Sequence, residues 1–138
     1  MKYYAILDTN VLVSAMLKAK SIPNRIVAEA MDGDIIPILN DNIITEYEEV
    51  LRRPKFNFEE HTLRVFLDEL KRRAIYVDTD IINYMLPDPK DIVFYAVLME
   101  KRKNDEAYLV TGNIKHYPVR TFIVTPREML DILQESKD

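Results

Sequence analysis

The feature that most constrains the fold is a regular alternation of short apolar segments with helical patterns along the 138 residues. Apolar segments of strand length occupy residues 3–7, 35–39, 75–77, 107–110 and 121–124. Helical patterns occupy residues 9–17, 23–32, 41–53, 59–73, 91–99 and the segment that begins at 126. Strands that alternate with helices form a parallel sheet covered on both faces. The sequence therefore predicts one α/β domain over residues 1–138, with a five-stranded parallel sheet between two helical layers.

The composition excludes several classes of protein. With 48% apolar residues and two glycines, the chain is neither disordered nor fibrous. It has no apolar run near the roughly 20 residues of a membrane span, and no signal-peptide core follows Met1, so we expect a cytoplasmic protein without a membrane partner. The absence of cysteine excludes disulfides and thiolate chemistry. A net charge of −4 means that nucleic-acid binding would need local basic patches.

Polar residues follow two of the apolar segments, where parallel α/β folds bind ligands beyond the carboxyl ends of their strands. Asp8 ends the first segment, Asn113 lies just after the fourth, and Asp91 begins the central apolar helix. Each acid also has a structural explanation. Asp8 can cap the helix that it precedes, and Asp91 can favour the dipole of its own helix. Asp88 lies between two prolines and is typical of a turn.

Two glutamates of the third helical pattern are further candidates for the site. On a helical wheel, Glu46 and Glu48 lie on opposite edges of the apolar face of residues 41–53, while Glu49 points away from it. Periodicity therefore nominates both Glu46 and Glu48 and cannot choose between them.

The acids gain significance as a set. Asp8, a glutamate of the third helix and Asp91 come from distant parts of the chain, yet all can reach one crevice at the strand ends. Clustered carboxylates repel one another unless a cation neutralises them. Oxygen ligands favour Mg²⁺ or Mn²⁺ over zinc. Such a centre can activate a water molecule for in-line attack on a phosphodiester.

The sequence resembles the PIN-domain nucleases, and within them the bacterial toxin components of toxin–antitoxin pairs. The segments that carry the resemblance are ILDTNVLVS at 6–14, ITEY at 44–47, DPKDIVFY at 88–95 and YLVTGN at 108–113. They span nearly the whole chain in the order of the family. The resemblance implies a three-layer α/β/α PIN-like fold with strand order 3-2-1-4-5.

The resemblance also implies roles for individual residues. Asp8, Glu46 and Asp91 match the acidic positions with which the family binds Mg²⁺ or Mn²⁺ and cleaves single-stranded RNA, so it selects Glu46 over Glu48. Asn113 stands where many members have a fourth aspartate; its amide can still ligate a metal, with one negative charge fewer. Thr9, Asn10 and Thr111 match polar positions that support the metal ligands.

RNA would be held by local positive charge, for which the chain offers four clusters. They are Arg52-Arg53-Pro54-Lys55, Lys71-Arg72-Arg73, Lys101-Arg102-Lys103, and Lys115-His116 with Arg120. The second and third are typical of helix ends, where cations complement the dipole. We expect Lys115, His116 and Arg120 to contact RNA phosphates, because they follow the fourth strand directly, and Tyr117 is a candidate for stacking on a base.

Three functions are compatible with these features. The first is an endoribonuclease that acts as the toxin of a type II toxin–antitoxin pair, which by resemblance forms a homodimer and is silenced by an antitoxin. The first helices and the segment 56–58, with Phe56 and Phe58, are candidate partner surfaces. The second is a weakly active or inactive interaction module, motivated by Asn113. The third, an aspartyl-phosphate phosphatase, requires an aspartate where the chain has Asn10.

Overall fold

The computed structural model describes residues 2–79 and 85–136 and contains the predicted alternation of strands and helices. Its strands are β1 (Tyr3–Leu7), β2 (Ile35–Leu39), β3 (Ile75–Tyr76), β4 (Ala107–Val110) and β5 (Ile123–Val124). Its α-helices are α1 (Thr9–Leu17), α2 (Ile22–Asp32), α3 (Asp41–Leu51), α4 (Glu60–Arg73), α5 (Ile92–Lys101) and α6 (Pro126–Glu135). Three short 3₁₀ turns, η1 (Pro54–Phe56), η2 (Pro89–Asp91) and η3 (Ile114–His116), connect them.

The strands form one parallel sheet in the order β3-β2-β1-β4-β5. The predicted fold class and strand order are therefore confirmed. Strand β1 lies at the centre, where its buried residues Ala5, Ile6 and Leu7 pair with β4. Leu7 is in register with Val110, so the chain leaves both strands at the same edge of the sheet. This register sets Asp8 opposite Thr111, the next residue after β4.

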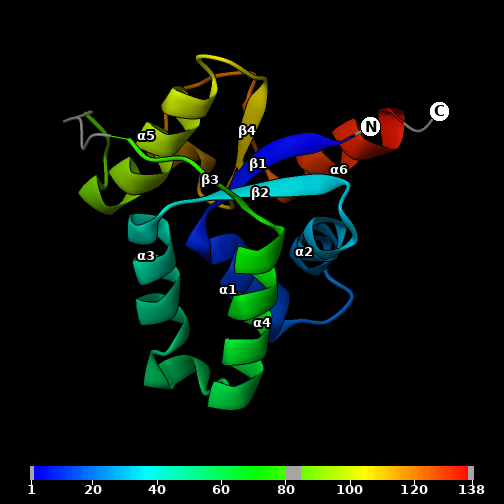
Figure 1. The fold of residues 1–138 in the computed structure, drawn as a ribbon, viewed down its shortest axis with the longest axis vertical. Coiled ribbons are helices and arrows are strands. Elements are labelled where there is room, and N and C mark those ends of the chain that lie inside the picture. The colour runs from blue at the N-terminus through cyan, green and yellow to red at the C-terminus, as the bar shows by residue number, and fades with distance from the viewer. Residues whose placement is uncertain (1, 80–84, 137–138) are drawn as a thin grey trace.

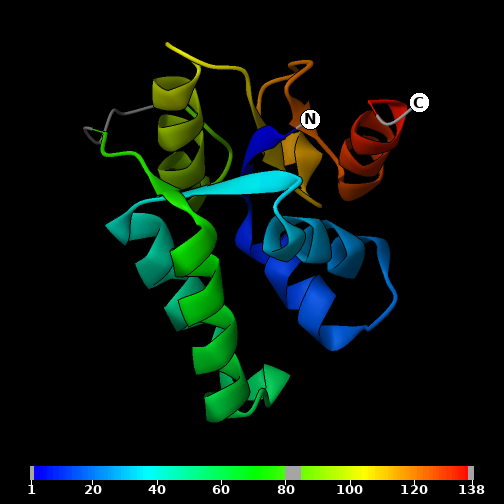
Figure 2. The same ribbon diagram turned by 45° about the vertical axis from the view of Figure 1, so that its right-hand side comes forward.

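The helices cover the two faces of the sheet unequally. Figure 1 shows α1 to α4 below the sheet and α5 above it. Helices α3 and α4 run side by side and project away from the sheet in both views (Figures 1 and 2). Among the described residues, no helix combines the length and apolar character needed to cross a membrane.

Local sequence signals place the helix ends. The Ser21 side chain accepts a hydrogen bond from the Asn24 amide at the start of α2, and the Asn40 side chain accepts one from Ile43 at the start of α3. Gly33 ends α2 at a φ of 98°, a conformation that glycine adopts without steric cost. These residues fix where α2 begins and ends and where α3 begins. The start of α3 therefore lies directly after the carboxyl end of β2.

Tyr47 locks α3 against the centre of the sheet. Its side chain is 1% exposed, and its hydroxyl donates a hydrogen bond to the carbonyl of Leu7, the last residue of β1. Its ring stacks on Phe94 of α5, with 6.2 Å between the ring centroids. One buried side chain thus ties together the elements that carry Asp8, Glu46 and Asp91.

The observed elements differ from the sequence prediction mainly at their ends. Strands β3 and β5 keep two residues each, shorter than the predicted 75–77 and 121–124, because an edge strand has a neighbour on one side only. The third helix ends at Leu51 and not at Arg53. Asp91 closes η2, one residue before α5 begins, because Pro89 sets up a separate 3₁₀ turn.

Removal of the Tyr47 hydroxyl is expected to destabilise the fold. Tyr47→Phe leaves the Leu7 carbonyl without this donor, and a buried unsatisfied group costs about 1–3 kcal/mol in the free energy of unfolding. Urea unfolding measures the change. Tyr76→Phe, on the half-exposed β3, is the matched control and should leave the unfolding midpoint unchanged. Equal stability of the two variants would contradict the role given to Tyr47.

Candidate metal centre

Asp8 is buried at the carboxyl end of β1, and helix capping does not explain its position. Its side chain is 5% exposed and makes no capping hydrogen bond to α1. Its Oδ2 atom instead accepts hydrogen bonds from the Thr111 hydroxyl at 2.8 Å and the Tyr117 hydroxyl at 3.0 Å. Asp8 is therefore held by side chains from the other half of the chain.

Thr111 is the hub of a polar network that joins the ends of β1 and β4. Its hydroxyl oxygen also accepts the Asn113 amide at 3.0 Å and the Asn10 side-chain amide at 3.4 Å. The Asn10 Oδ1 atom accepts the Gly112 amide at 2.8 Å, and a Cβ atom on Gly112 would lie only 3.1 Å from it. The network brings Asn10 and Thr111 to Asp8, and their support of metal ligands stays a prediction. The Thr9 hydroxyl is buried with no hydrogen-bond partner among the described residues.

Asp91 faces a histidine from the loop after β4. Its side chain makes no capping bond to α5, and its Oδ2 atom lies 3.0 Å from His116 Nδ1. Asp88 caps the turn below it by accepting the Lys90 amide, which is the predicted turn role. Donor atoms of Asp88, Asp91 and His116 all lie within 4.8 Å of one another, a spacing that one metal ion could bridge.

Burial raises the pKa of both aspartates, and the charge of Asp8 adds to the increase at Asp91. Burial raises the pKa of Asp8 above its usual value, although the hydroxyls of Thr111 and Tyr117 act in the opposite direction. Burial, followed by the charge of Asp8, raises the pKa of Asp91 to about 6, against the influence of His116. Asp8 thus lies close enough to Asp91 for its negative charge to disfavour ionisation of Asp91, an effect that a bound cation would reverse.

Glu46 lies on the side of α3 that faces these aspartates. Burial and then the charge of Glu49 raise its pKa, and Asp8 adds a smaller effect in the same direction. The cations Lys90 and Arg53 oppose the increase. Glu46 is therefore within electrostatic range of Asp8, although its carboxylate is not part of the group formed by Asp88, Asp91 and His116.

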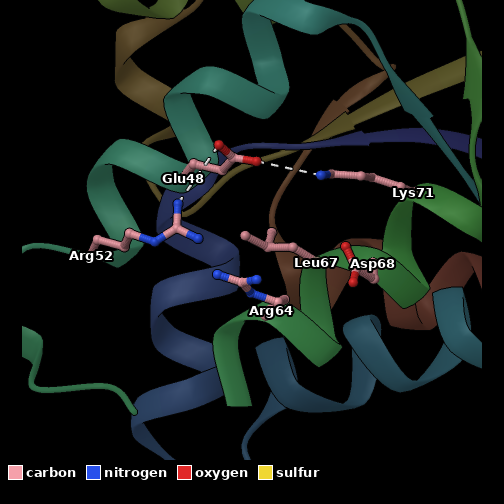
Figure 3. A pocket seen from close by; sticks show the side chains of 6 residues that line it. All are labelled: Glu48, Arg52, Arg64, Leu67, Asp68 and Lys71. Atoms are coloured by element: carbon pink, nitrogen blue, oxygen red, sulfur yellow. Dashed lines mark hydrogen bonds and ion pairs between the residues drawn. The ribbon is translucent and has the colours of Figure 1, made fainter. Parts of the chain in front are cut away.

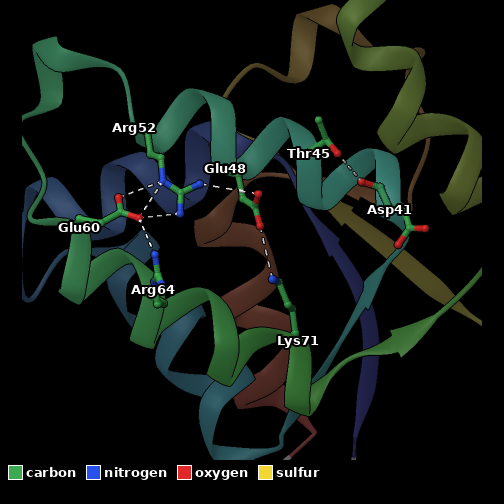
Figure 4. A network of polar contacts seen from close by, with 7 residues as sticks. All are labelled: Asp41, Thr45, Glu48, Arg52, Glu60, Arg64 and Lys71. Atoms are coloured by element: carbon green, nitrogen blue, oxygen red, sulfur yellow. Dashed lines mark hydrogen bonds and ion pairs between the residues drawn. The ribbon is translucent and has the colours of Figure 1, made fainter.

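Glu48 belongs to a different surface. It forms ion pairs with Arg52 at 3.7 Å and with Lys71 of α4 at 3.4 Å. Figure 3 shows Glu48 between these two cations, over a pocket of about 270 Å³ between α3 and α4. As Figure 4 shows, Arg52 also contacts Glu60 of α4. The distance from Arg52 Nη2 to Glu60 Oε1 is 2.9 Å. The structure thus separates two glutamates that the helical wheel left equivalent.

The donor set suits a hard divalent ion. Asp88 and Asp91 offer carboxylate oxygens and His116 adds one ring nitrogen, while the carboxylate of Asp8 lies nearby but is not part of this group. Carboxylates favour Mg²⁺ and Mn²⁺, whereas an imidazole ligand is more typical of zinc, copper, iron and nickel. The residues present therefore fit a divalent metal at the carboxyl ends of β1 and β4.

Most of the basic clusters are neutralised by neighbouring acids. Lys71, Arg72 and Arg73 end α4, where the two arginines pair with Glu69. The cluster at the end of α5 is engaged as well: Lys101 pairs with Asp105, Lys103 pairs with Glu100, and Arg102 donates to the Ala107 carbonyl. Both clusters are the helix-end charges that the sequence predicted. Lys115 and Arg120 are exposed and form no ion pair with any described residue.

The two aromatic predictions concern Tyr117 and the pair Phe56 and Phe58, and the structure shows how these rings pack. Tyr117 is only 5% exposed, stacks on Tyr95 with 6.4 Å between ring centroids and donates to Asp8, so most of its surface is used inside the protein, and its contact with a base stays a prediction. Phe56 and Phe58 stack on each other and are half-buried, and Phe58 packs against the core. Their role as a partner surface stays a prediction.

Sequence reasoning missed three contributors to the site. Tyr117 was overlooked as a donor to Asp8, Asp88 as a neighbour of Asp91, and Lys90 as a cation near Glu46. The DPKD run offered a signal for Asp88 and Lys90, because residues next to the candidate ligand Asp91 lie near the same crevice. No pattern in the sequence connects Tyr117 with Asp8, 109 residues away.

The raised pKa of Asp91 predicts a pH dependence of stability. Between about pH 4 and 6, folded Asp91 keeps a proton that the unfolded chain releases, so its contribution to stability is lost as the pH rises through this window. In metal-free buffer, Asp91→Asn should raise the free energy of unfolding on the order of 1 kcal/mol near pH 7.5 and little near pH 4. Urea unfolding at both pH values measures this difference.

The control for this experiment removes a carboxylate elsewhere. Asp131→Asn, on the exposed face of α6, should give the same change in stability at both pH values. A loss of stability for Asp91→Asn near pH 7.5 would contradict the prediction, because it would mean that the ionised carboxylate stabilises the fold.

Comparison with known proteins agrees with this architecture. The family model described as PIN domain matches residues 4–115. No curated protein and no solved structure matches the chain. PIN domains are generally metal-dependent nucleases, and the matched range includes Asp8, Glu46 and Asp91. The match covers more than half of the sequence, and the chain therefore belongs to the PIN domain family.

Proposed function

We propose that this protein is an endoribonuclease that uses Mg²⁺ or Mn²⁺ to cleave single-stranded RNA. The observation that carries the proposal is a pair of buried aspartates, Asp8 at the carboxyl end of β1 and Asp91 in the turn that leads into α5, which lie close enough to interact electrostatically. Neither side chain makes a capping hydrogen bond, and the charge of Asp8 disfavours ionisation of Asp91. Such an arrangement is costly unless the site binds a cation.

The residues divide into metal ligands and supporting groups. Asp8, Glu46 and Asp91 are the proposed ligands, with Asn113 as a neutral auxiliary. The hydroxyls of Thr111 and Tyr117 both donate to Oδ2 of Asp8 and so fix the orientation of its carboxylate for a metal. Asn10 braces Thr111, and the unpartnered Thr9 hydroxyl is available for a water molecule or ligand. When bound, the metal would neutralise the carboxylates and polarise the attacking water and the phosphodiester.

The substrate assignment rests on the free cations around the carboxylates. Lys115 and Arg120 lie beyond β4, and Lys90 and Arg53 lie close enough to Glu46 to lower its pKa. A phosphate backbone passing over the site would meet positive charge on both sides. His116 is directed at Asp91, so its contact with RNA would follow from its place at the metal.

The biological role proposed here is that of a cytoplasmic toxin of a type II toxin–antitoxin pair. The resemblance of four motifs to bacterial PIN toxins supports it. A homodimer and a bound antitoxin are the corresponding partners. An inactive interaction module is the alternative, and it is favoured by the missing charge at Asn113.

Cleavage assays test the proposal by comparing variants of Asp8 and Glu46 with a control variant of Glu48. Asp8→Asn and Glu46→Gln should each lower the rate of Mg²⁺- or Mn²⁺-dependent cleavage of a labelled single-stranded RNA by more than about 100-fold, beyond the 10–100-fold typical of outer-shell changes. Glu48→Gln, on the same helix, should keep the wild-type rate, because Glu48 pairs with α4. Cleavage that survives Asp8→Asn would refute the mechanism, and a wild-type protein without activity would support the interaction module.

A charge restored at position 113 is expected to strengthen metal binding. Asn113→Asp supplies the carboxylate that many family members have, so Mn²⁺ should bind roughly tenfold more tightly. Isothermal titration calorimetry measures the dissociation constant. Asn104→Asp, in the exposed loop after α5, is the control for a simple increase in negative charge. Equal gains for the two variants would remove Asn113 from the ligand set.

A further inference from the structure

A pocket beside the metal centre is not used by the proposed chemistry. It has a volume of about 390 Å³, within the range of roughly 300–1,000 Å³ typical of small-molecule sites. Its lining combines four apolar or aromatic residues with two cations: Ile114, Tyr117, Val119, Ile123, Lys115 and Arg120. All six come from the segment between the end of β4 and the start of β5.

The pocket has a buried floor and an exposed apolar rim. Tyr117 and Ile123 are 5% and 3% exposed and form the floor. Val119 is 94% exposed and Ile114 is 37% exposed, so both present apolar surface to solvent. A side chain as exposed as that of Val119 contributes little to the folded core, and therefore stability does not account for it.

Tyr117 connects this pocket with the carboxylates. It lines the pocket, while its hydroxyl donates to Asp8. The preceding residue, His116, contacts Asp91. A ligand in the pocket would therefore lie on the far side of the Tyr117 ring from the metal ligands, next to the point of cleavage.

The charges of the pocket select a negatively charged, partly apolar ligand. Lys115 and Arg120 have no acidic partner among the described residues, and the Arg120 guanidinium donates to the Val119 carbonyl, which holds it at the rim. The cations at the ends of α4 and α5 are, by contrast, paired with acids. An apolar cavity flanked by two free cations complements a flat base that is attached to a phosphate backbone.

We propose that this pocket binds one unpaired nucleobase of the substrate next to the cleaved phosphodiester. Lys115 and Arg120 contact the adjoining phosphates, and Val119 and Ile114 cover the base. The inference rests on the proposed function and adds a physical basis for the choice of substrate. A base in a duplex is stacked and paired, so only a single strand can place a base in the pocket without the cost of unpairing it.

Binding assays that separate base from backbone test this proposal without cleavage. The probes are a fluorescent single-stranded oligoribonucleotide, an abasic oligomer of the same length and charge, and the corresponding RNA duplex. Fluorescence anisotropy is measured with the full chain in buffer without divalent metal. The wild-type protein should bind the base-containing single strand more tightly than either of the other probes.

Two variants assign the contacts. Val119→Ser should weaken binding of the base-containing strand by roughly three- to tenfold and leave the abasic oligomer unaffected. Arg120→Gln should weaken both and reduce the dependence of binding on salt. Val65→Ser, which alters a 55% exposed valine on α4, is the matched control and should change neither.

Each other result overturns the inference. Equal binding of abasic and base-containing strands, no binding of any probe, or an equal effect of Val119→Ser on both single strands would exclude a base pocket. A change of oligomeric state in Val119→Ser, measured by light scattering, would assign the surface to a second copy of the chain. Because this assay measures binding without cleavage, failure of the base pocket can be distinguished from failure of the proposed nuclease activity.

Discussion

The structure depends on how a carboxylate is kept at the buried end of the central strand. Asp8 follows three residues that are at most 1% exposed, and its solvation by water is replaced by two hydroxyl groups. Both hydroxyls come from beyond β4, so the parallel pairing of β1 with β4 is required before Asp8 can be accommodated. Tyr47 then fixes α3 to the same strand end through the Leu7 carbonyl. The fold and the site are thus built by the same few contacts.

Much of the fold could be predicted from the sequence, because its signals are local. The apolar composition of segments such as 3–7 and 107–110 indicates that they are buried strands. Capping residues such as Ser21 and Asn40 indicate where helices begin. Strand ends were less predictable: a residue such as Phe122 is apolar in either case, and only the neighbouring strand decides whether it pairs. The strand order came from resemblance, since periodicity carries no information on which strands are adjacent.

The site was less predictable, because its contacts are between residues far apart in the sequence. The wheel treated Glu46 and Glu48 as equals, and only the packing of α4 shows that Glu48 is occupied by Lys71. A tyrosine near a basic cluster favoured base stacking, whereas burial directs the Tyr117 hydroxyl to Asp8. Sequence patterns identify which residues carry suitable chemistry; three-dimensional packing decides which of them remain available for it.

The limits of the PIN domain match have a practical meaning for this chain. The matched range ends at residue 115, whereas the sheet is completed by β5 and the core by Met129 and Leu133 of α6. Tyr117 also lies beyond that boundary. A fragment trimmed to the matched residues would lose one of the two donors to Asp8 together with an edge of the sheet. Inactivity of such a fragment would therefore report a damaged scaffold and would say nothing about the chemistry of the intact protein.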